Sequence, residues 1–297
     1  MSGTNPETFL IVCNGRTGST WLETMLGCLP EVAVDYELKW NPIGYELLPH
    51  LKVIPNQASC CGDILRGLSD QHPVVGSKLV LDKRSYSPSE FSDLHQAIDP
   101  DIRIIHLVRD YYEIVLSWYR GVYHILNENA SNGESEANSE IYKSIAKGDS
   151  RKDFNLLEKA SYVMRLLKQF TQTRDPLPIM QLLNRHGFAN FDTSDREIQK
   201  FKIDLEHCLA NDLWAQALRQ SNKDYCVVRY SEIPEAFPSL VKFIGSDAPD
   251  SLVHEILENP ISKKLPPKEA KLLCSSPDRL KEMCNEFNRR RDLALDI

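Results

Sequence analysis

At 297 residues, the chain can hold one large α/β domain or two small domains, and its 42% hydrophobic residues suffice for a sizeable core. The net charge of −7 argues against a nucleic-acid-binding protein, which would usually be basic, but is compatible with an anionic small ligand. No stretch approaches the roughly 20 apolar residues of a membrane span, and the N-terminus, MSGTNPET, lacks a signal-peptide pattern. The eight cysteines form no CxxC pair, so we expect reduced thiols and a cytoplasmic location.

The most informative stretch is FLIVCNGRTGSTWLETML, residues 9–26. Four apolar residues are followed by a loop of small and polar residues at 15–20 and then by apolar residues at helical spacing. This pattern predicts a buried strand, a tight turn and a helix whose first N–H groups point into the turn. Because such a helix start attracts anions and Arg16 adds a positive charge, we expect a phosphate site here.

The rest of the chain alternates between strands and helices. Further strands are expected at 73–81, 102–108 and 224–230, with a short extended piece at 32–34; helices are expected at about 88–98, 110–126, 154–171, 195–220, 233–245 and in the last part of the tail. Residues 127–153 contain few apolar side chains and form an exposed insertion, which we interpret as a disordered loop, a lid over the substrate pocket, or both. The alternation predicts a single α/β domain over residues 1–297, with three layers (α/β/α) around a mostly parallel sheet.

Several polar residues fall at the carboxyl ends of these strands, where α/β sheets bind ligands. Arg16, Arg109 and Tyr230 all lie at or just past such ends. Ser117 follows Arg109 by eight residues, about two helical turns, so its hydroxyl can face the same side as the guanidinium. Arginine and serine together suit a second phosphate, and two such sites would suit a nucleoside with phosphate at both ends. His106, on an apolar strand, is expected to be a hydrogen-bonded core histidine.

The first loop matches the nucleotide-binding P-loop, GxxxxGK[ST], only in part. The Gly-Lys pair is missing, and no predicted strand ends in the aspartate that would hold magnesium. A P-loop kinase that uses ATP is therefore an alternative that these residues disfavour. The sequence shows no His/Cys/Asp cluster with ligand spacing, so no metal is expected.

Three segments resemble the sulfotransferase family in the order that the family shows. GRTGSTW resembles its 5′-phosphosulfate loop, IIHLVRDYYEIVLSWYR its 3′-phosphate loop, and DYCVVRYSEIPEAFPSLVKFIG the strand and helix that close its core. The resemblance implies a P-loop-NTPase-like sulfotransferase fold and transfer of a sulfuryl group from 3′-phosphoadenosine 5′-phosphosulfate (PAPS) to a hydroxyl or amine, which releases the bisphosphate PAP. The acceptor would be a small molecule, carbohydrate or lipid. A family member that binds PAPS without transfer is a second alternative.

The resemblance also implies roles for individual residues. The first loop would hold the 5′-phosphate and the transferring sulfate through Gly15, Arg16, Thr17, Gly18, Ser19 and Thr20. Arg109 and Ser117 would hold the 3′-phosphate. Trp21 would pack against the adenine or serve as a core aromatic, and Tyr230 would touch the adenine or be a buried structural tyrosine.

A hydroxyl acceptor also needs a general base. Cytosolic small-molecule members of the family place a histidine two residues after a strand lysine; Lys78 fits that lysine, but Val80 stands where the histidine would be. The tyrosylprotein and trehalose branches place a glutamate after the first helix, and Glu37, 21 residues past Arg16, has a similar spacing. We therefore expect Glu37 to be the base, with Asp35 as the alternative. Lys78 and Arg16 would stabilise charge on the sulfuryl group, unless Lys78 forms an ordinary ion pair.

Overall fold

The computed structural model describes residues 6–40, 51–54, 72–81, 86–117, 180, 190, 192–222, 224–259 and 276–297. The predicted insertion at 127–153 and the predicted helix at 154–171 lie outside these residues. The chain forms two compact units: Met1–Ile114, Asp204–Pro266 and Cys284–Ile297 make the first, and Val115–Ile203 and Pro267–Met283 the second. The single domain over residues 1–297 stays a prediction. Of the candidate site residues, all but Ser117 belong to the first unit.

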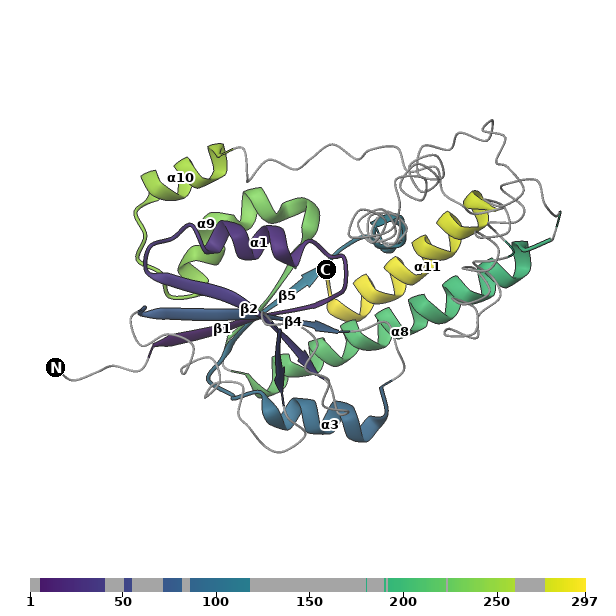
Figure 1. Cartoon of the computed structure of the whole chain (residues 1–297), viewed down its shortest axis with the longest axis horizontal. Helices are drawn as coiled ribbons and strands as arrows, with labels where there is room; N and C mark the ends of the chain where they lie inside the picture. Colours follow the sequence, from purple (N-terminus) through teal and green to yellow (C-terminus); the bar gives the residue numbers. More distant parts are fainter. Residues whose placement is uncertain are drawn as a thin grey trace, which may run out of the picture. The chain divides into compact units, whose positions relative to one another are not determined.

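The first unit is built on a six-stranded sheet with the strand order β3-β2-β4-β1-β5-β6 (Figure 1). Every pair of neighbouring strands is parallel. The strands are β1 (Glu7–Asn14), β2 (Val32–Trp40), β3 (Leu51–Ile54), β4 (Val74–Leu81), β5 (Arg103–Val108) and β6 (Tyr225–Arg229). Because the strands are parallel, all their carboxyl ends lie at one edge, and β1, β5 and β6 are neighbours there.

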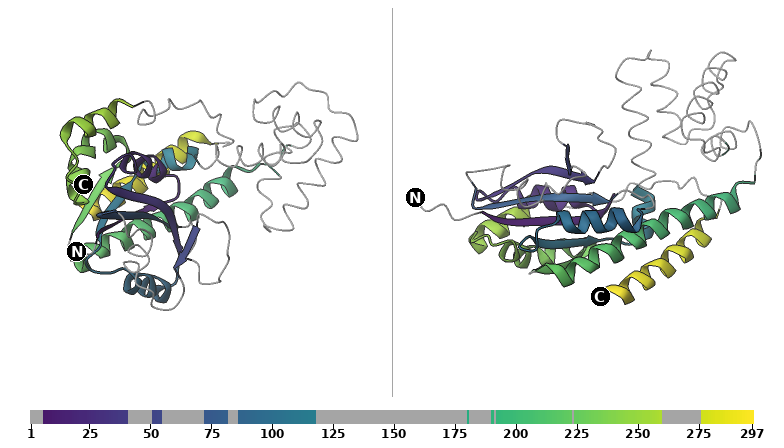
Figure 2. Two further views of the ribbon diagram at one scale, coloured as in Figure 1. Left: turned by 60° about the vertical axis from the view of Figure 1, so that its left-hand side comes forward. Right: turned by 90° about the horizontal axis from the view of Figure 1, so that it is seen from below.

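Helices cover both faces of this sheet because its central strands are apolar on both sides. The helices are α1 (Ser19–Leu26), α3 (Pro88–Ala97), α8 (Ser194–Ser221), α9 (Ile233–Phe243), α10 (Asp250–Glu258) and α11 (Pro277–Leu295). Alternate residues of β1 enter two separate cores: Phe9 and Ile11 pack with α1, α9 and α10, whereas Leu10 and Val12 pack with α3 and α8 (Figures 1 and 2). The predicted three-layer α/β architecture with a parallel sheet is confirmed.

Local signals account for several of the element boundaries. At the start of α3, the Ser87 hydroxyl accepts a hydrogen bond from the Glu90 N–H, and the Glu90 carboxylate accepts one from the Ser87 N–H. These two reciprocal hydrogen bonds form a capping box, which fixes the start of the helix. Just after α9, Gly245 has a φ of +83°, a left-handed conformation that ends the helix.

The edge of the sheet differs from the sequence-based expectation. The extended piece expected at 32–34 continues to Trp40, and β3 was not expected at all. The pairing of β2 with β4 shifts between Val34 and Glu37, so β2 carries an irregularity at this point. Within the described part of the chain, none of the helices is both long and apolar enough to cross a membrane.

The packing between the neighbouring strands β1 and β4 can be tested by a substitution at Gly76. A Cβ atom at this position would lie 2.1 Å from Cζ of Phe9, whose side chain is fully buried. We expect Gly76→Ala to lower the free energy of unfolding, measured by urea denaturation, by about 1–3 kcal/mol, because the ring has no room to move. Gly27→Ala is the control: its nearest contact would be 3.3 Å, and we expect a change within about 1 kcal/mol. Equal effects of the two substitutions would contradict this packing.

Candidate active site

The first loop is a tight turn between β1 and α1. Two of its residues have left-handed backbone conformations, Arg16 with a φ of 70° and Gly18 with a φ of 93°. The Thr17 hydroxyl donates a hydrogen bond of 2.9 Å to the carbonyl of Asn14, the last residue of β1. Non-glycine residues adopt a positive φ at an energetic cost, and such residues cluster at functional sites. The loop thus delivers the N-terminus of α1, with its unsatisfied N–H groups, to the carboxyl edge of the sheet.

Gly18 is also required by its neighbour Tyr230. A Cβ atom at position 18 would lie 2.3 Å from Cε2 of the Tyr230 ring. The same ring meets Trp21 edge to face, with centroids 5.4 Å apart, and the Arg109 guanidinium carbon lies 4.0 Å from its centroid. Burial raises the pKa of Tyr230, although Arg109 acts in the opposite direction. The hydroxyl of Tyr230 is therefore protonated at neutral pH.

Arg109 connects the two loops of the candidate site. It lies in the second loop, residues 109–111 after β5, and contacts the first loop, residues 15–20. It directly follows β5, and its Nη1 donates a hydrogen bond of 3.1 Å to the carbonyl of Arg16. Its Nε donates to the Glu113 carboxylate at 2.8 Å. Among the described residues, Nη2 of Arg109 makes no hydrogen bond, so this nitrogen is available to an anionic ligand. Ser117 lies among the helical residues 111–117 and is half-buried; it belongs to the second unit, and its role beside Arg109 stays a prediction.

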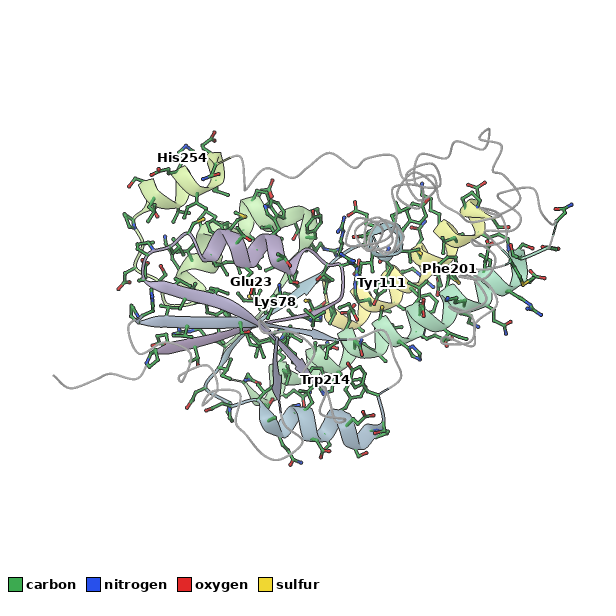
Figure 3. All side chains as sticks on the ribbon, in the orientation of Figure 1. Glu23, Lys78, Tyr111, Phe201, Trp214 and His254 are labelled. Atoms are coloured by element: carbon green, nitrogen blue, oxygen red, sulfur yellow. The ribbon has the colours of Figure 1, made fainter. Side chains whose placement is uncertain are left out.

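Lys78 forms a nearly buried ion pair under α1. Its ammonium lies 2.6 Å from the Glu23 carboxylate and donates a hydrogen bond of 3.0 Å to the Thr20 hydroxyl (Figure 3). The two ion-paired side chains are only 9% and 12% exposed. The ordinary ion pair is therefore present, and it also brings the lysine to the first loop. Glu23 was missed by the sequence analysis, although it follows Thr20 by three residues on the same helix.

The backbone places Glu37 beside Lys78. The two residues are partners in the register of β2 and β4, and neighbouring strands lie about 4.8 Å apart. The irregularity between Val34 and Glu37 also covers Asp35, the alternative base. The general base and the lysine predicted from the sequence thus lie on adjacent strands.

A buried carboxylate joins the bases of the two loops. Asp212 of α8 is 2% exposed and accepts hydrogen bonds of 2.7 Å from both Asn14 and Tyr111. Asn14 immediately precedes the first loop, and Tyr111 comes two residues after Arg109. Burial, together with the Asp212 charge, raises the pKa of Tyr111 well above its ordinary value, so its hydroxyl remains a donor.

His106 completes this network from β5. Its Nε2 lies 3.3 Å from the Asp212 carboxylate and its Nδ1 lies 2.7 Å from the Tyr225 hydroxyl. Each ring nitrogen of His106 thus has a polar partner, and burial raises the pKa of the Tyr225 hydroxyl. His106 is therefore the hydrogen-bonded core histidine that the sequence predicts.

A small cavity opens beside Arg109 at the ends of β5 and β6. Its volume is about 130 Å³, and α11 supplies part of its wall. The lining residues are Val108, Arg109, Asp110, Glu113, Arg229, Tyr230, Ser231, Asn288, Arg291 and Asp292. Three guanidinium groups thus meet three carboxylates around one cavity, so its lining contains both hydrogen-bond donors and acceptors.

No candidate metal centre is found among the described residues: none of their His, Cys, Asp and Glu side chains form a group of three or more that could hold a metal ion.

No protein-family model and no curated protein matches this sequence. Among solved structures, the chain is similar to a sulfotransferase from Alicyclobacillus acidocaldarius, with 11% identity, a TM-score of 0.46, and coverage of 99% of this chain and 95% of that one. It is also similar to mouse sulfotransferase SULT7A1 complexed with PAP, with 14% identity, a TM-score of 0.35, and coverage of 97% and 82%.

The Lys78–Glu23 pair can be tested with a double-mutant cycle. Removing one partner leaves a charge in a nearly buried position, so we expect Lys78→Met and Glu23→Leu each to lower the free energy of unfolding by about 3–5 kcal/mol. The double variant should lose less than the sum, because the Lys78–Glu23 interaction is already absent from each single variant. The exposed pair Lys242–Asp250, with side chains 75% and 88% exposed, is the control and should show almost no coupling. Additive effects at Lys78 and Glu23 would contradict the pairing.

Proposed function

We propose that this protein is a sulfotransferase that moves a sulfuryl group from PAPS to a hydroxyl or amine acceptor. One observation carries the proposal: two arginine-bearing loops follow adjacent parallel strands, β1 and β5, and Arg109 of the second loop donates a hydrogen bond to the Arg16 carbonyl of the first. Two adjoining anion sites at the carboxyl edge of a sheet suit a nucleotide with phosphate at both the 5′ and the 3′ position.

The residues present fit such a nucleotide. The left-handed turn at 15–18 presents the N-terminus of α1 to an anion, as phosphate-binding loops do. Among the described residues, Nη2 of Arg109 makes no hydrogen bond, and the cavity beside it is lined by two further guanidinium groups as well as by three carboxylates. The 5′-phosphosulfate would be held by the first loop, from Gly15 to Thr20, and the 3′-phosphate by Arg109 and Ser117. Trp21 and Tyr230, which pack against each other, would contact the adenine.

The strand register supports the proposed catalytic roles of Glu37 and Lys78. When bound, PAPS supplies the reactive sulfuryl group and PAP is the leaving group. Glu37 would accept the proton of the acceptor hydroxyl as its oxygen bonds to sulfur. Lys78, its partner on the neighbouring strand, would stabilise charge on the sulfuryl group together with Arg16. Glu23 would hold the Lys78 ammonium beside Thr20 of the loop.

Binding of PAP, measured by calorimetry, tests the nucleotide site. We expect the protein to bind PAP more tightly than AMP, which lacks the 3′-phosphate. Arg109→Ala should weaken PAP binding by on the order of 10- to 100-fold with a smaller effect on AMP, because a charge-assisted hydrogen bond to the 3′-phosphate is lost. Arg289→Ala, which removes an exposed arginine paired with Glu286, is the control. A preference for magnesium–ATP over PAP would instead favour a kinase.

Transfer of sulfate from PAPS to a generic phenol tests the general base. We expect Glu37→Gln to leave PAP affinity unchanged and to lower the transfer rate by on the order of 10²–10⁴-fold, since the amide cannot accept the proton. Asp35→Asn is the matched comparison and should retain activity. The reverse pattern would assign the base to Asp35. An intact protein that binds PAP and transfers no sulfate to any phenol, sugar or amine would be a binding protein of this class.

A further inference from the structure

The backbone of the second loop is held by side chains of the C-terminal helix, α11. The Tyr111 N–H donates a hydrogen bond of 3.0 Å to Oδ1 of Asn288, and Nδ2 of Asn288 donates one of 2.5 Å to the Asp110 carboxylate. Nη1 of Arg291 donates one of 2.5 Å to the carbonyl of Arg109. All three residues from Arg109 to Tyr111 are therefore held from this one helix.

Arg291 is an unusual residue in this position because it is only 2% exposed. Its Nε and Nη2 donate hydrogen bonds of 2.9 Å and 2.7 Å to the Asp292 carboxylate. Its guanidinium carbon lies 4.8 Å from the centroid of the Tyr111 ring. Burying a guanidinium is costly unless its charge and its N–H groups are paired, and here the Arg109 carbonyl is one of the required partners. The arginine and the loop backbone therefore depend on each other.

The run Arg289-Arg290-Arg291 shows that this contact is specific. Arg289 forms an exposed ion pair with Glu286, and Arg290 lies over the Phe287 ring with its guanidinium carbon 5.0 Å from the centroid. Arg291, by contrast, donates a hydrogen bond to the Arg109 carbonyl of the second loop. Asn288 precedes it by three residues, a spacing that places both on one face of the helix.

We propose that Asn288 and Arg291 are positioning residues that fix the Arg109 backbone, and thereby the direction of its guanidinium, so that the site selects nucleotides with a 3′-phosphate. This inference rests on the proposed function. Neither residue needs to touch the nucleotide. Their contribution is to keep Arg109 oriented before binding, which lowers the conformational entropy lost when the phosphate binds.

The test compares PAP and AMP affinities in two matched variants. Arg291→Met removes the buried guanidinium, and Arg289→Met removes the same charge from the exposed face of the same helix. We expect Arg291→Met to reduce the preference for PAP over AMP by about ten-fold or more, and Arg289→Met to leave it unchanged. An unchanged preference in folded Arg291→Met, or an equal loss of affinity for both nucleotides, would overturn the inference.

A second variant keeps the test decisive if Arg291→Met does not fold. Asn288→Ala removes the acceptor of the Tyr111 N–H, so this amide should exchange with solvent faster in the ligand-free protein, and the preference for PAP should fall. Unchanged amide exchange would overturn the inference even if the wild-type protein binds neither nucleotide. That failure of wild-type binding would itself count against the proposed function, so the two outcomes can be told apart.

Discussion

The arrangement of both loops depends on one buried carboxylate. Asp212 accepts hydrogen bonds from Asn14, at the end of β1, and from Tyr111, just after Arg109, and it lies next to His106 of β5. The hydrogen bonds from Asn14 and Tyr111 offset the cost of burying this polar group. Since each donor belongs to a different segment at the carboxyl edge of the sheet, the carboxylate fixes the distance between the bases of the two loops. The hydrogen bond from Arg109 to the Arg16 carbonyl then joins the two loops to each other.

The central part of the fold was predictable because its signal is local. Mostly apolar runs at β1, β4 and β5 are typical of strands buried on both faces, and Ser87 and Glu90 mark the start of α3. The prediction failed at the edge of the sheet. Residues 35–40 of β2, DYELKW, carry charged residues without an apolar run, and β3 has only four residues between stretches with Pro49 and Pro55. Short edge strands depend on pairing with a neighbour more than on their own pattern.

The candidate site was predictable only where its residues are close in sequence or at strand ends. Arg16, Arg109 and Tyr230 follow β1, β5 and β6, so the parallel topology alone predicts that they meet. Asp212 and Glu23 were missed because their importance comes from contacts with residues 101 and 55 positions away, respectively. A carboxylate within a mostly apolar helical stretch, as in LANDLWAQAL, was the available signal for Asp212.

The support of the second loop by α11 also has a consequence for biosynthesis. Asn288 and Arg291 follow their loop partners by 177 and 182 residues. At roughly 5–20 residues per second, the ribosome needs on the order of ten seconds or more to add them. During that time, the nascent chain can assemble β1, β4 and β5, but the Arg109 carbonyl and the Tyr111 N–H have no partners from α11. The second loop therefore reaches its final conformation late, after most strands of the sheet have been synthesised.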